Sequence, residues 1–156
     1  MSIEKVRNYF EQFQKANLIQ EFEVSSATVE LAAKALHCEP ERIAKSLSLK
    51  TKTNYILIVT AGDVKIDNSK YKATFNTKAK MLSPVEVKEH IGHEIGGICP
   101  FAVKEEVLVY LDVSLKRFSS VFPACGSSNS AIELTIPELE KYSNYQEWVD
   151  VCKRIK

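Results

Sequence analysis

The chain has 156 residues, of which 45% are hydrophobic and 26% are charged, and its formal net charge is +1. This length and apolar content fit one compact domain, residues 1–156, and exclude an intrinsically disordered chain or a disulfide-stapled mini-protein. No apolar run approaches the roughly 18 residues that a membrane span needs. The N-terminal residues also lack the apolar stretch of a secretion signal, so we expect a cytoplasmic protein.

Hydrophobic spacing predicts short helices in the first half of the chain, and Asp67 is the predicted N-cap of the last of them. These helices cover residues 2–17, 27–36, 40–44 and 69–75. Between them, alternating or continuous apolar residues predict short strands. These strands cover residues 21–25, 45–50, 54–60 and 79–82.

Two capping boxes mark helix starts in the second half. Ser83 is followed by a proline and then by Glu86, three residues after the cap, while Gly92 is the predicted end of that helix. Thr135 and Glu138 open another helix in the same way. Strands are predicted at residues 107–112, 121–124 and 131–135, and a last helix is predicted from about residue 144.

This order of elements predicts the fold class. Short strands and helices follow one another without a regular βαβ alternation. We therefore expect an α/β fold with a compact mixed sheet of about seven short strands and surrounding helices, rather than a doubly wound parallel sheet.

The cysteines and histidines offer little chemistry. The four cysteines are widely spaced with no C-x-x-C pair, so no zinc knuckle or redox motif is predicted. Cys99 and Cys125 lie in glycine-containing loops, where a nucleophilic thiol is one hypothesis and an ordinary buried cysteine is the alternative that we favour. His90 and His93 are separated by Gly92, the predicted helix end, so we expect no metal site and no cofactor.

Two glycine-containing loops and one lysine are more informative. Residues 96–100 and 124–130 let the backbone approach a ligand closely and direct peptide groups at it, although ordinary turns are the alternative. Lys45 begins an alternating strand with Leu47 and Leu49 on the same side, so its ammonium faces the core or its rim. Burying that charge is costly unless an anion pairs with it. A strand that starts one residue later would instead leave Lys45 in solvent.

Four ordered segments carry a more specific signal than any single motif. They are Ala32-Ala33-Lys34-Ala35-Leu36, Ile43-Ala44-Lys45-Ser46-Leu47, Ile95-Gly96-Gly97-Ile98-Cys99-Pro100-Phe101, and Cys125-Gly126-Ser127 followed by Ile132-Glu133-Leu134-Thr135. At compatible spacing over residues 21–139, these segments resemble the YbaK/prolyl-tRNA synthetase associated domain family.

The resemblance implies a YbaK-like compact mixed α/β domain that hydrolyses wrongly charged aminoacyl-tRNA, either free-standing or inserted in a prolyl-tRNA synthetase. The family's lysine corresponds to Lys45, which is the expected catalytic residue. The expected substrate-binding residues share a place in the family's motifs: Ser46, Gly96, Gly97, Pro100, Gly126 and Ser127. The implied partners are mischarged tRNA and prolyl-tRNA synthetase.

Two functional hypotheses from different classes follow. The leading one is a trans-editing hydrolase that cleaves the ester bond of mischarged aminoacyl-tRNA, with tRNA(Pro) as the tRNA. The alternative is a non-catalytic module of the same fold that binds tRNA or an aminoacyl-adenylate and docks to a synthetase. Ala131 motivates the alternative, because the cysteine-specific subgroup of the family carries an aspartate at that place.

The charge is distributed unevenly along the chain. Residues 42–80 contain nine basic and two acidic residues, a local charge of +7, whereas the remainder contains 12 basic and 18 acidic residues. A basic part that includes Lys45 fits a protein that receives a phosphate backbone on one side, and a solvated lysine-rich surface is the alternative. The near-neutral total therefore does not exclude tRNA as a partner.

Overall fold

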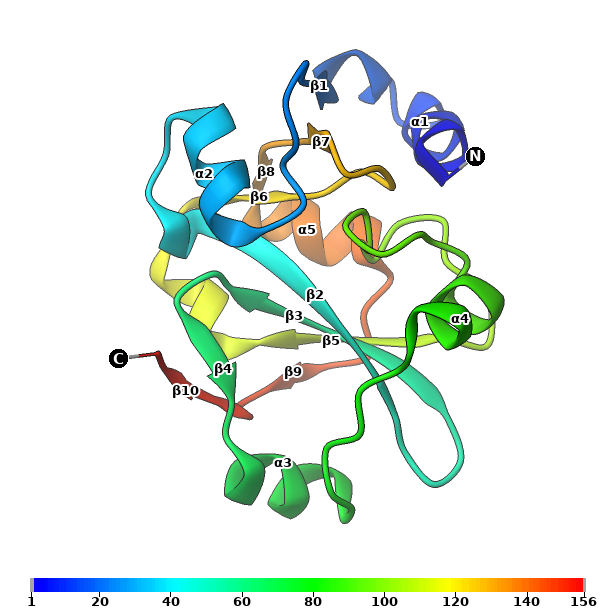
Figure 1. Cartoon of the computed structure of the whole chain (residues 1–156), viewed down its shortest axis with the longest axis vertical. Helices are drawn as coiled ribbons and strands as arrows, with labels where there is room; N and C mark the ends of the chain where they lie inside the picture. Colours follow the sequence, from blue (N-terminus) through cyan, green and yellow to red (C-terminus); the bar gives the residue numbers. More distant parts are fainter. Residues whose placement is uncertain (1, 156) are drawn as a thin grey trace.

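The computed structural model describes residues 2–155, which fold around one curled, six-stranded mixed sheet (Figure 1). The strand order is β8-β6-β2-β3-β5-β9. The strands are β2 (Ile43–Lys50), β3 (Tyr55–Ala61), β5 (Leu108–Asp112), β6 (Ser120–Pro123), β8 (Leu134–Thr135) and β9 (Trp148–Val149). β2–β3 and β6–β8 are antiparallel pairs, whereas β2–β6, β3–β5 and β5–β9 are parallel. The predicted mixed α/β fold is confirmed.

Two short antiparallel ladders lie outside this sheet. β1 (Gln20–Glu21) pairs with β7 (Ser130–Ala131), and β4 (Val64–Ile66) pairs with β10 (Cys152–Arg154). The first ladder joins the N-terminal segment to the second glycine-containing loop. The second joins the end of the chain to its middle.

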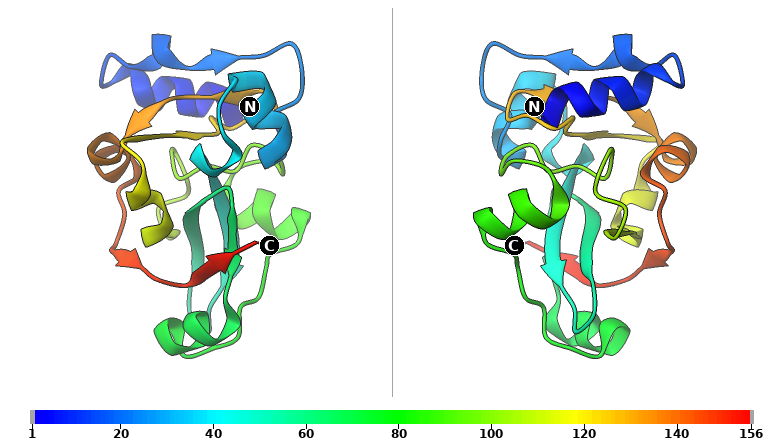
Figure 2. Two further views of the ribbon diagram at one scale, coloured as in Figure 1. Left: turned by 90° about the vertical axis from the view of Figure 1, so that its left-hand side faces the viewer. Right: turned by 90° about the vertical axis from the view of Figure 1, so that its right-hand side faces the viewer.

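The helices are short and surround the sheet. Within residues 2–155 the α-helices are α1 (Ser2–Glu11), α2 (Val29–Leu36), α3 (Asn68–Phe75), α4 (Pro84–Glu86) and α5 (Ile136–Ser143). The remaining turns are η1 (Ala16–Leu18), η2 (Pro40–Arg42), the π-helical η3 (Val87–Ile91) that continues α4, and η4 (Val113–Arg117). Figure 2 shows α1 and α3 at opposite ends of the molecule. None of the described helices is both long and apolar enough to cross a membrane.

Side-chain caps explain where several helices begin. The Ser83 hydroxyl accepts from the Glu86 N–H at 3.2 Å, and the Glu86 carboxylate accepts from the Ser83 N–H at 2.9 Å. Thr135 and Glu138 form the same reciprocal pair at the start of α5. Asp67 caps α3. These predictions are confirmed because a cap needs only residues that are close in sequence.

The helix predicted from residue 144 onward is wrong. Trp148 and Val149 form β9 against β5, and Cys152 begins β10 opposite Ile66 of β4. Apolar residues at positions 148, 151, 152 and 155 also fit a helix, but two sheet edges are available to this segment. Pairing with those edges satisfies its backbone groups in the extended form.

Several element boundaries also differ from expectation. The first helix ends at Glu11, and the turn expected at residues 40–44 ends at Arg42, because Ile43 already pairs with β6. The strand expected at residues 79–82 is reduced to one bridge between Met81 and Leu49. The strand at residues 21–25 shortens to β1, that at residues 131–135 divides between β7 and β8, and β4 was not expected at all.

One edge of β2 changes partner along its length. Its first two residues pair with β6, and this ladder stops at Pro123, which has no N–H to donate. At its far end the Lys50 N–H donates to the Lys80 carbonyl at 3.0 Å. Among the described residues no strand pairs with this edge from 45 to 47. The sheet is therefore open beside Lys45.

Buried apolar residues lie on both faces of the sheet. The larger cluster includes Phe10 of α1. The Phe10 ring packs edge to face against the Phe101 ring, with centroids 4.8 Å apart, and against the Tyr142 ring of α5, with centroids 5.4 Å apart. The smaller cluster brings Leu49 and Tyr71 together with Val64 of β4 and Cys152 of β10. Phe101 follows the first glycine-containing loop directly, so the core anchors that loop.

Candidate functional site

A cavity of about 210 Å³ lies at the open edge of β2. Its walls come from α2, from the start of β2, and from both glycine-containing loops. The lining residues are Ser26, Ala27, Thr28, Val29, Ala32, Ile43, Ala44, Lys45, Ser46, Gly96, Ile98, Phe122, Ala124, Ser130 and Ala131. Three of the expected site residues, Lys45, Ser46 and Gly96, thus meet at one cavity.

Lys45 is half-buried in the wall of this cavity. Burial lowers the pKa of Lys45, and the neighbouring Cys152, Asp63 and Glu30 partly oppose that shift. Asp63 is already held by Arg117, whose guanidinium donates two hydrogen bonds to its carboxylate. Among the described residues Lys45 forms no ion pair. A partly desolvated ammonium without a counter-ion favours an anionic or strongly polar ligand.

Ser46 presents a second unpaired polar group. Its Oγ is buried and has no hydrogen-bond partner among the described residues. A buried hydroxyl that lacks a partner is destabilising by about 1–3 kcal/mol. Ser46 lines the cavity, although its Oγ itself is closed to solvent.

Gly96 lies where the first glycine-containing loop meets α2. Its φ is +92°, a conformation that L side chains rarely adopt. A Cβ at this position would stand 3.2 Å from the Ala27 Cβ and 3.4 Å from the Ser128 Cβ. Gly96 therefore lets the loop turn tightly at the cavity wall.

Gly97, another expected binding residue, is absent from the lining of the cavity and packs against the second glycine-containing loop. A Cβ at Gly97 would stand 2.5 Å from the carbonyl carbon of Gly126 and 2.5 Å from the nitrogen of Ser127. The Gly97 N–H donates to the Glu94 carbonyl at 3.0 Å, so it is engaged in a turn. Gly97 and Gly126 thus bring the backbones of two loops into direct contact, behind the lining of the cavity.

Ser127 and Pro100 also do not line this cavity. The Ser127 Oγ lies 2.9 Å from Asn129 Oδ1 and 2.7 Å from the Oγ of Ser130, which does line the cavity. Pro100 lines a separate cavity of about 390 Å³ beside α5, together with Tyr142. The structure therefore divides the expected binding residues between a lining and a supporting layer.

The two loop cysteines are not activated. Cys99 and Cys125 are fully buried, and neither lines the cavity. Burial raises the pKa of Cys99 to about 12 and that of Cys125 well above its ordinary value. The thiolate, which is the nucleophilic form, is thus disfavoured at neutral pH. The thiol-nucleophile hypothesis gains no support.

The two neighbouring imidazoles make separate contacts. His90 stacks on Tyr55 with a centroid distance of 4.0 Å. His93 is buried, and its Nε2 lies 2.7 Å from the Phe101 carbonyl and 3.5 Å from the Cys99 sulfur. Burial lowers the pKa of His93. Within residues 2–155 no group of three metal-ligating side chains occurs.

The sequence did not indicate the part played by α2. Thr28 and Val29 line the cavity, and the Thr28 Oγ caps α2 by accepting from the Leu31 N–H at 3.2 Å. A threonine before an apolar helical pattern was the available signal. Phe122 and Ser130 reach the cavity through long-range strand pairing, for which the sequence holds no local signal.

The residues that line the cavity lie in a segment that matches a known protein family. The family model described as "Aminoacyl-tRNA editing domain" matches residues 23–142. The chain belongs to this family. The match includes the whole lining of the cavity. The family resemblance noted from the sequence is thereby confirmed.

Similar proteins occur both as chains of similar length and within ligases. "Uncharacterized protein YwhH" of Bacillus subtilis (strain 168) is 58% identical over 154 residues, which cover 98% of each chain. A proline–tRNA ligase of Geobacillus sp. (strain WCH70) is 27% identical over 125 residues, and this match covers 80% of the chain but 22% of the ligase. "Putative Cys-tRNA(Pro)/Cys-tRNA(Cys) deacylase EbsC" of Enterococcus faecalis is 28% identical over 76% of the chain and 74% of that protein.

Solved structures share the whole fold. A structure described as "Crystal structure of a putative trans-editing enzyme for prolyl tRNA synthetase" aligns with a TM-score of 0.87 at 26% identity, over 97% of both chains. Hypothetical protein APE2540 aligns with a TM-score of 0.81 at 22% identity, over 93% of this chain and 99% of its own, which supports the fold alone.

Proposed function

We propose that the protein is a trans-editing hydrolase that cleaves the ester bond of mischarged aminoacyl-tRNA, with tRNA(Pro) as the tRNA. The observation that carries this proposal is the cavity of an aminoacyl-tRNA editing domain in which Lys45, Ser46 and Gly96 converge. Similarity to a prolyl-tRNA synthetase trans-editing structure over nearly the whole chain supports action in trans. We expect this activity in the cytoplasm, beside prolyl-tRNA synthetase.

The size and lining of the cavity favour a small aminoacyl group. A volume of about 210 Å³ is below the roughly 300–1,000 Å³ of pockets that enclose drug-sized ligands. Alanines 32, 44, 124 and 131 together with Phe122 make its wall mostly small and apolar. Such a wall excludes large side chains sterically but separates side chains that differ by one methylene by only about 1–3 kcal/mol.

Lys45 supplies the charge that the reaction needs. Attack of water on the ester carbonyl forms a tetrahedral intermediate with a negative oxygen, and a fixed cation in a partly dry cavity stabilises that charge more strongly than bulk water does. The same ammonium can instead hold the terminal phosphate of the RNA. Gly96 and Ile98 also line the cavity, and their peptide N–H groups are our candidates for additional donors.

Within the part of the chain that the structure describes, no carboxylate and no imidazole lines the cavity. An aminoacyl ester is already activated, so positioning the water and stabilising the oxyanion provide most of the catalysis. We propose that the vicinal ribose hydroxyl of the substrate assists the attacking water. Ser46, which lines the cavity, would contact the aminoacyl group.

The test is deacylation of a panel of mischarged tRNA(Pro) species under multiple turnover. Lys45→Met keeps the length of the side chain and removes its charge, so kcat/KM should fall by about 10²–10³-fold, as when an oxyanion contact is removed. Lys116→Met is the matched control: Lys116 lies in η4, outside the cavity lining, and its ammonium stands 4.5 Å from the centroid of the Trp148 ring. Absence of turnover on every tRNA, or an undiminished rate in Lys45→Met, would refute the proposal.

A second candidate function is a non-catalytic module that binds tRNA or an aminoacyl-adenylate and docks to a synthetase. The observation in its favour is the lack of a side-chain base in the lining, together with Ala131 in the wall. Binding of aminoacyl-tRNA without any turnover by the purified protein would support it. Multiple turnover would eliminate it.

A further inference from the structure

The surface around α3 is strongly basic. No acidic residue occurs from residue 68 to residue 85. Lys70 in this segment is occupied, because its Nζ lies 3.0 Å from an Asp150 carboxylate oxygen and 3.0 Å from the Cys152 carbonyl. The other three lysines of this segment, and Lys65 of β4, are exposed and form no ion pair among the described residues. These form the α3 basic surface: Lys65, Lys72, Lys78 and Lys80.

A hollow of about 500 Å³ lies within this surface, between α3 and the segment that follows it. It is lined by Asn68, Ser69, Lys72, Lys78 and Ala79. Two lysines, an asparagine and a serine thus border one depression. A phosphate group, which accepts several hydrogen bonds and carries negative charge, matches this set of donors.

The carboxylates next to this surface are engaged in helix caps. Asp67 accepts from the Lys70 N–H at 3.1 Å. Glu86 is held in its capping box by Ser83, and nearby Lys50 and Lys80 help to lower its pKa. Neither acid forms an ion pair with a lysine of the α3 basic surface among the described residues. The surface therefore keeps an excess of positive charge.

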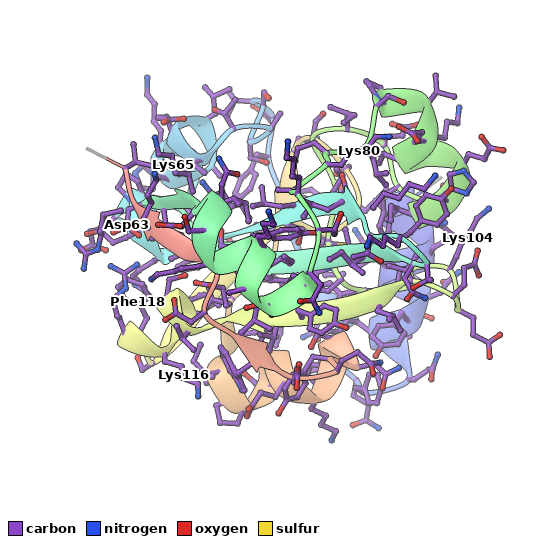
Figure 3. All side chains as sticks on the ribbon, turned by 90° about the horizontal axis from the view of Figure 1, so that it is seen from below. Asp63, Lys65, Lys80, Lys104, Lys116 and Phe118 are labelled. Atoms are coloured by element: carbon purple, nitrogen blue, oxygen red, sulfur yellow. The ribbon has the colours of Figure 1, made fainter. Side chains whose placement is uncertain are left out.

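The α3 basic surface is linked to the cavity by β2. Lys45 is at the cavity, and five residues later the Lys50 backbone bonds to Lys80. Five strand residues span about 17 Å, so a short stretch of RNA strand can bridge the cavity and the surface. Figure 3 looks at the molecule from the α3 end and shows Lys65 and Lys80 on one side of α3 and Lys116 on the other.

On the basis of the proposed function, we propose that the α3 basic surface binds backbone phosphates of the RNA behind the aminoacylated 3′ end. The end itself enters the cavity beside Lys45, and the strand then follows β2 toward the hollow at α3. Phosphate contacts of this kind position a nucleic acid without reading its sequence. The surface therefore contributes affinity and orientation, and selectivity for the amino acid stays with the cavity.

An RNA backbone fits this surface better than an acidic protein does. Protein interfaces concentrate their energy in Trp, Tyr and Arg anchors, and the α3 basic surface consists of lysines with no such anchor among them. Lysine is a compact, well-hydrated charge that suits a phosphate without requiring a precise fit.

The binding test uses fluorescence anisotropy with uncharged tRNA(Pro) between about 50 and 200 mM salt, where each neutralised phosphate changes the affinity by about threefold. The variant is Lys72→Glu/Lys78→Glu. Between 50 and 200 mM salt the affinity of this variant should fall by a factor about tenfold smaller than that of the wild type, because two phosphate contacts are gone. Lys116→Glu/Lys141→Glu makes the same change in net charge away from the surface and should bind nearly as the wild type does.

The kinetic test compares two substrates: a mischarged tRNA and the aminoacyl ester of the terminal nucleoside alone. Lys72→Glu/Lys78→Glu should raise KM for the tRNA by about tenfold or more with kcat unchanged. It should not affect hydrolysis of the nucleoside ester, which has no RNA body. A Tm equal to that of the wild type would show that the variant is folded.

The outcomes separate this proposal from the proposed function. Equal salt dependence of tRNA affinity in the wild type and in Lys72→Glu/Lys78→Glu would overturn the proposed phosphate contacts. So would a loss of tRNA affinity in Lys116→Glu/Lys141→Glu as large as that in Lys72→Glu/Lys78→Glu. Titration with prolyl-tRNA synthetase in place of tRNA would then test an acidic protein as the occupant. Wild-type protein that binds tRNA through the surface but hydrolyses neither substrate would refute the hydrolase alone.

Discussion

The contact between Gly97 and the second glycine-containing loop makes a specific prediction for Gly97→Ala. The new Cβ would stand 2.5 Å from two backbone atoms, the Gly126 carbonyl carbon and the Ser127 nitrogen. Carbon atoms in contact normally lie about 3.5–4.0 Å apart. Because both neighbours are main chain, no side chain can rotate away, and the two loops must separate by about 1 Å.

The expected effect has a part in stability and a part in activity. Overpacking of a well-packed site is destabilising by about 1–3 kcal/mol. A loss of about 2 kcal/mol lowers Tm by about 4–8 °C in a chain of this length. The same separation displaces Gly96 and Ser130, which line the cavity, and a misplacement of about 1 Å can reduce the rate about 10²-fold.

The assay pairs thermal unfolding with deacylation of mischarged tRNA, and Gly92→Ala is the control. Gly92 also has a left-handed φ, +94°, but its nearest neighbours are the flexible ends of Lys5 and Lys104, and it does not line the cavity. Gly92→Ala should be destabilising by about 1 kcal/mol and retain the wild-type kcat/KM. If Gly97→Ala unfolds at the wild-type temperature with full activity, the backbone contact does not hold the cavity in shape.

Three further outcomes are expected. In the native protein iodoacetamide should modify at most the partly exposed Cys38, with activity retained, as mass spectrometry before and after unfolding would show; rapid labelling of the other three thiols would contradict their burial. Burial lowers the pKa of His93 in the folded protein. At a pH below about 6.5, the ordinary pKa of histidine, the unfolded chain therefore binds more protons than the folded protein does. Stability to urea should therefore fall from about pH 7 to pH 5, by at most about 1.4 kcal/mol per pH unit, and a slope retained in His93→Gln would refute this assignment. Thr135→Ala removes the cap of α5 and should be destabilising by about 1 kcal/mol in the same urea titration, with a smaller change in Thr135→Ser.

Local chemistry decided which elements the sequence could predict. The starts of α4 and α5 follow from capping boxes that span four residues, so no knowledge of the rest of the fold is needed. β9 and β10 depend on edges presented by β5 and β4, which lie far away in sequence. The apolar spacing of a short segment fits both a helix and a strand, and only the presence of a strand to pair with decides between them.

The candidate site divides in the same way. The alternation of Lys45 with Leu47 and Leu49 correctly places the lysine at the rim of a buried face, because strand parity is a local property. The sequence also marks Gly97 as unusual, but it gives no reason for a glycine there. That reason is a contact with Gly126, 29 residues away, which exists only in the folded chain.

The open edge of β2 has a consequence for how this protein can change. Pro123 ends the pairing with β6, and the cavity occupies the place where the ladder would have continued. The opening is thus a property of the path of the main chain, and every sequence that keeps this path keeps the opening. Substitutions at positions such as 32, 44, 122 and 124 can resize the wall without closing it. Selectivity for the amino acid can therefore drift by single side-chain replacements while Lys45 stays where it is.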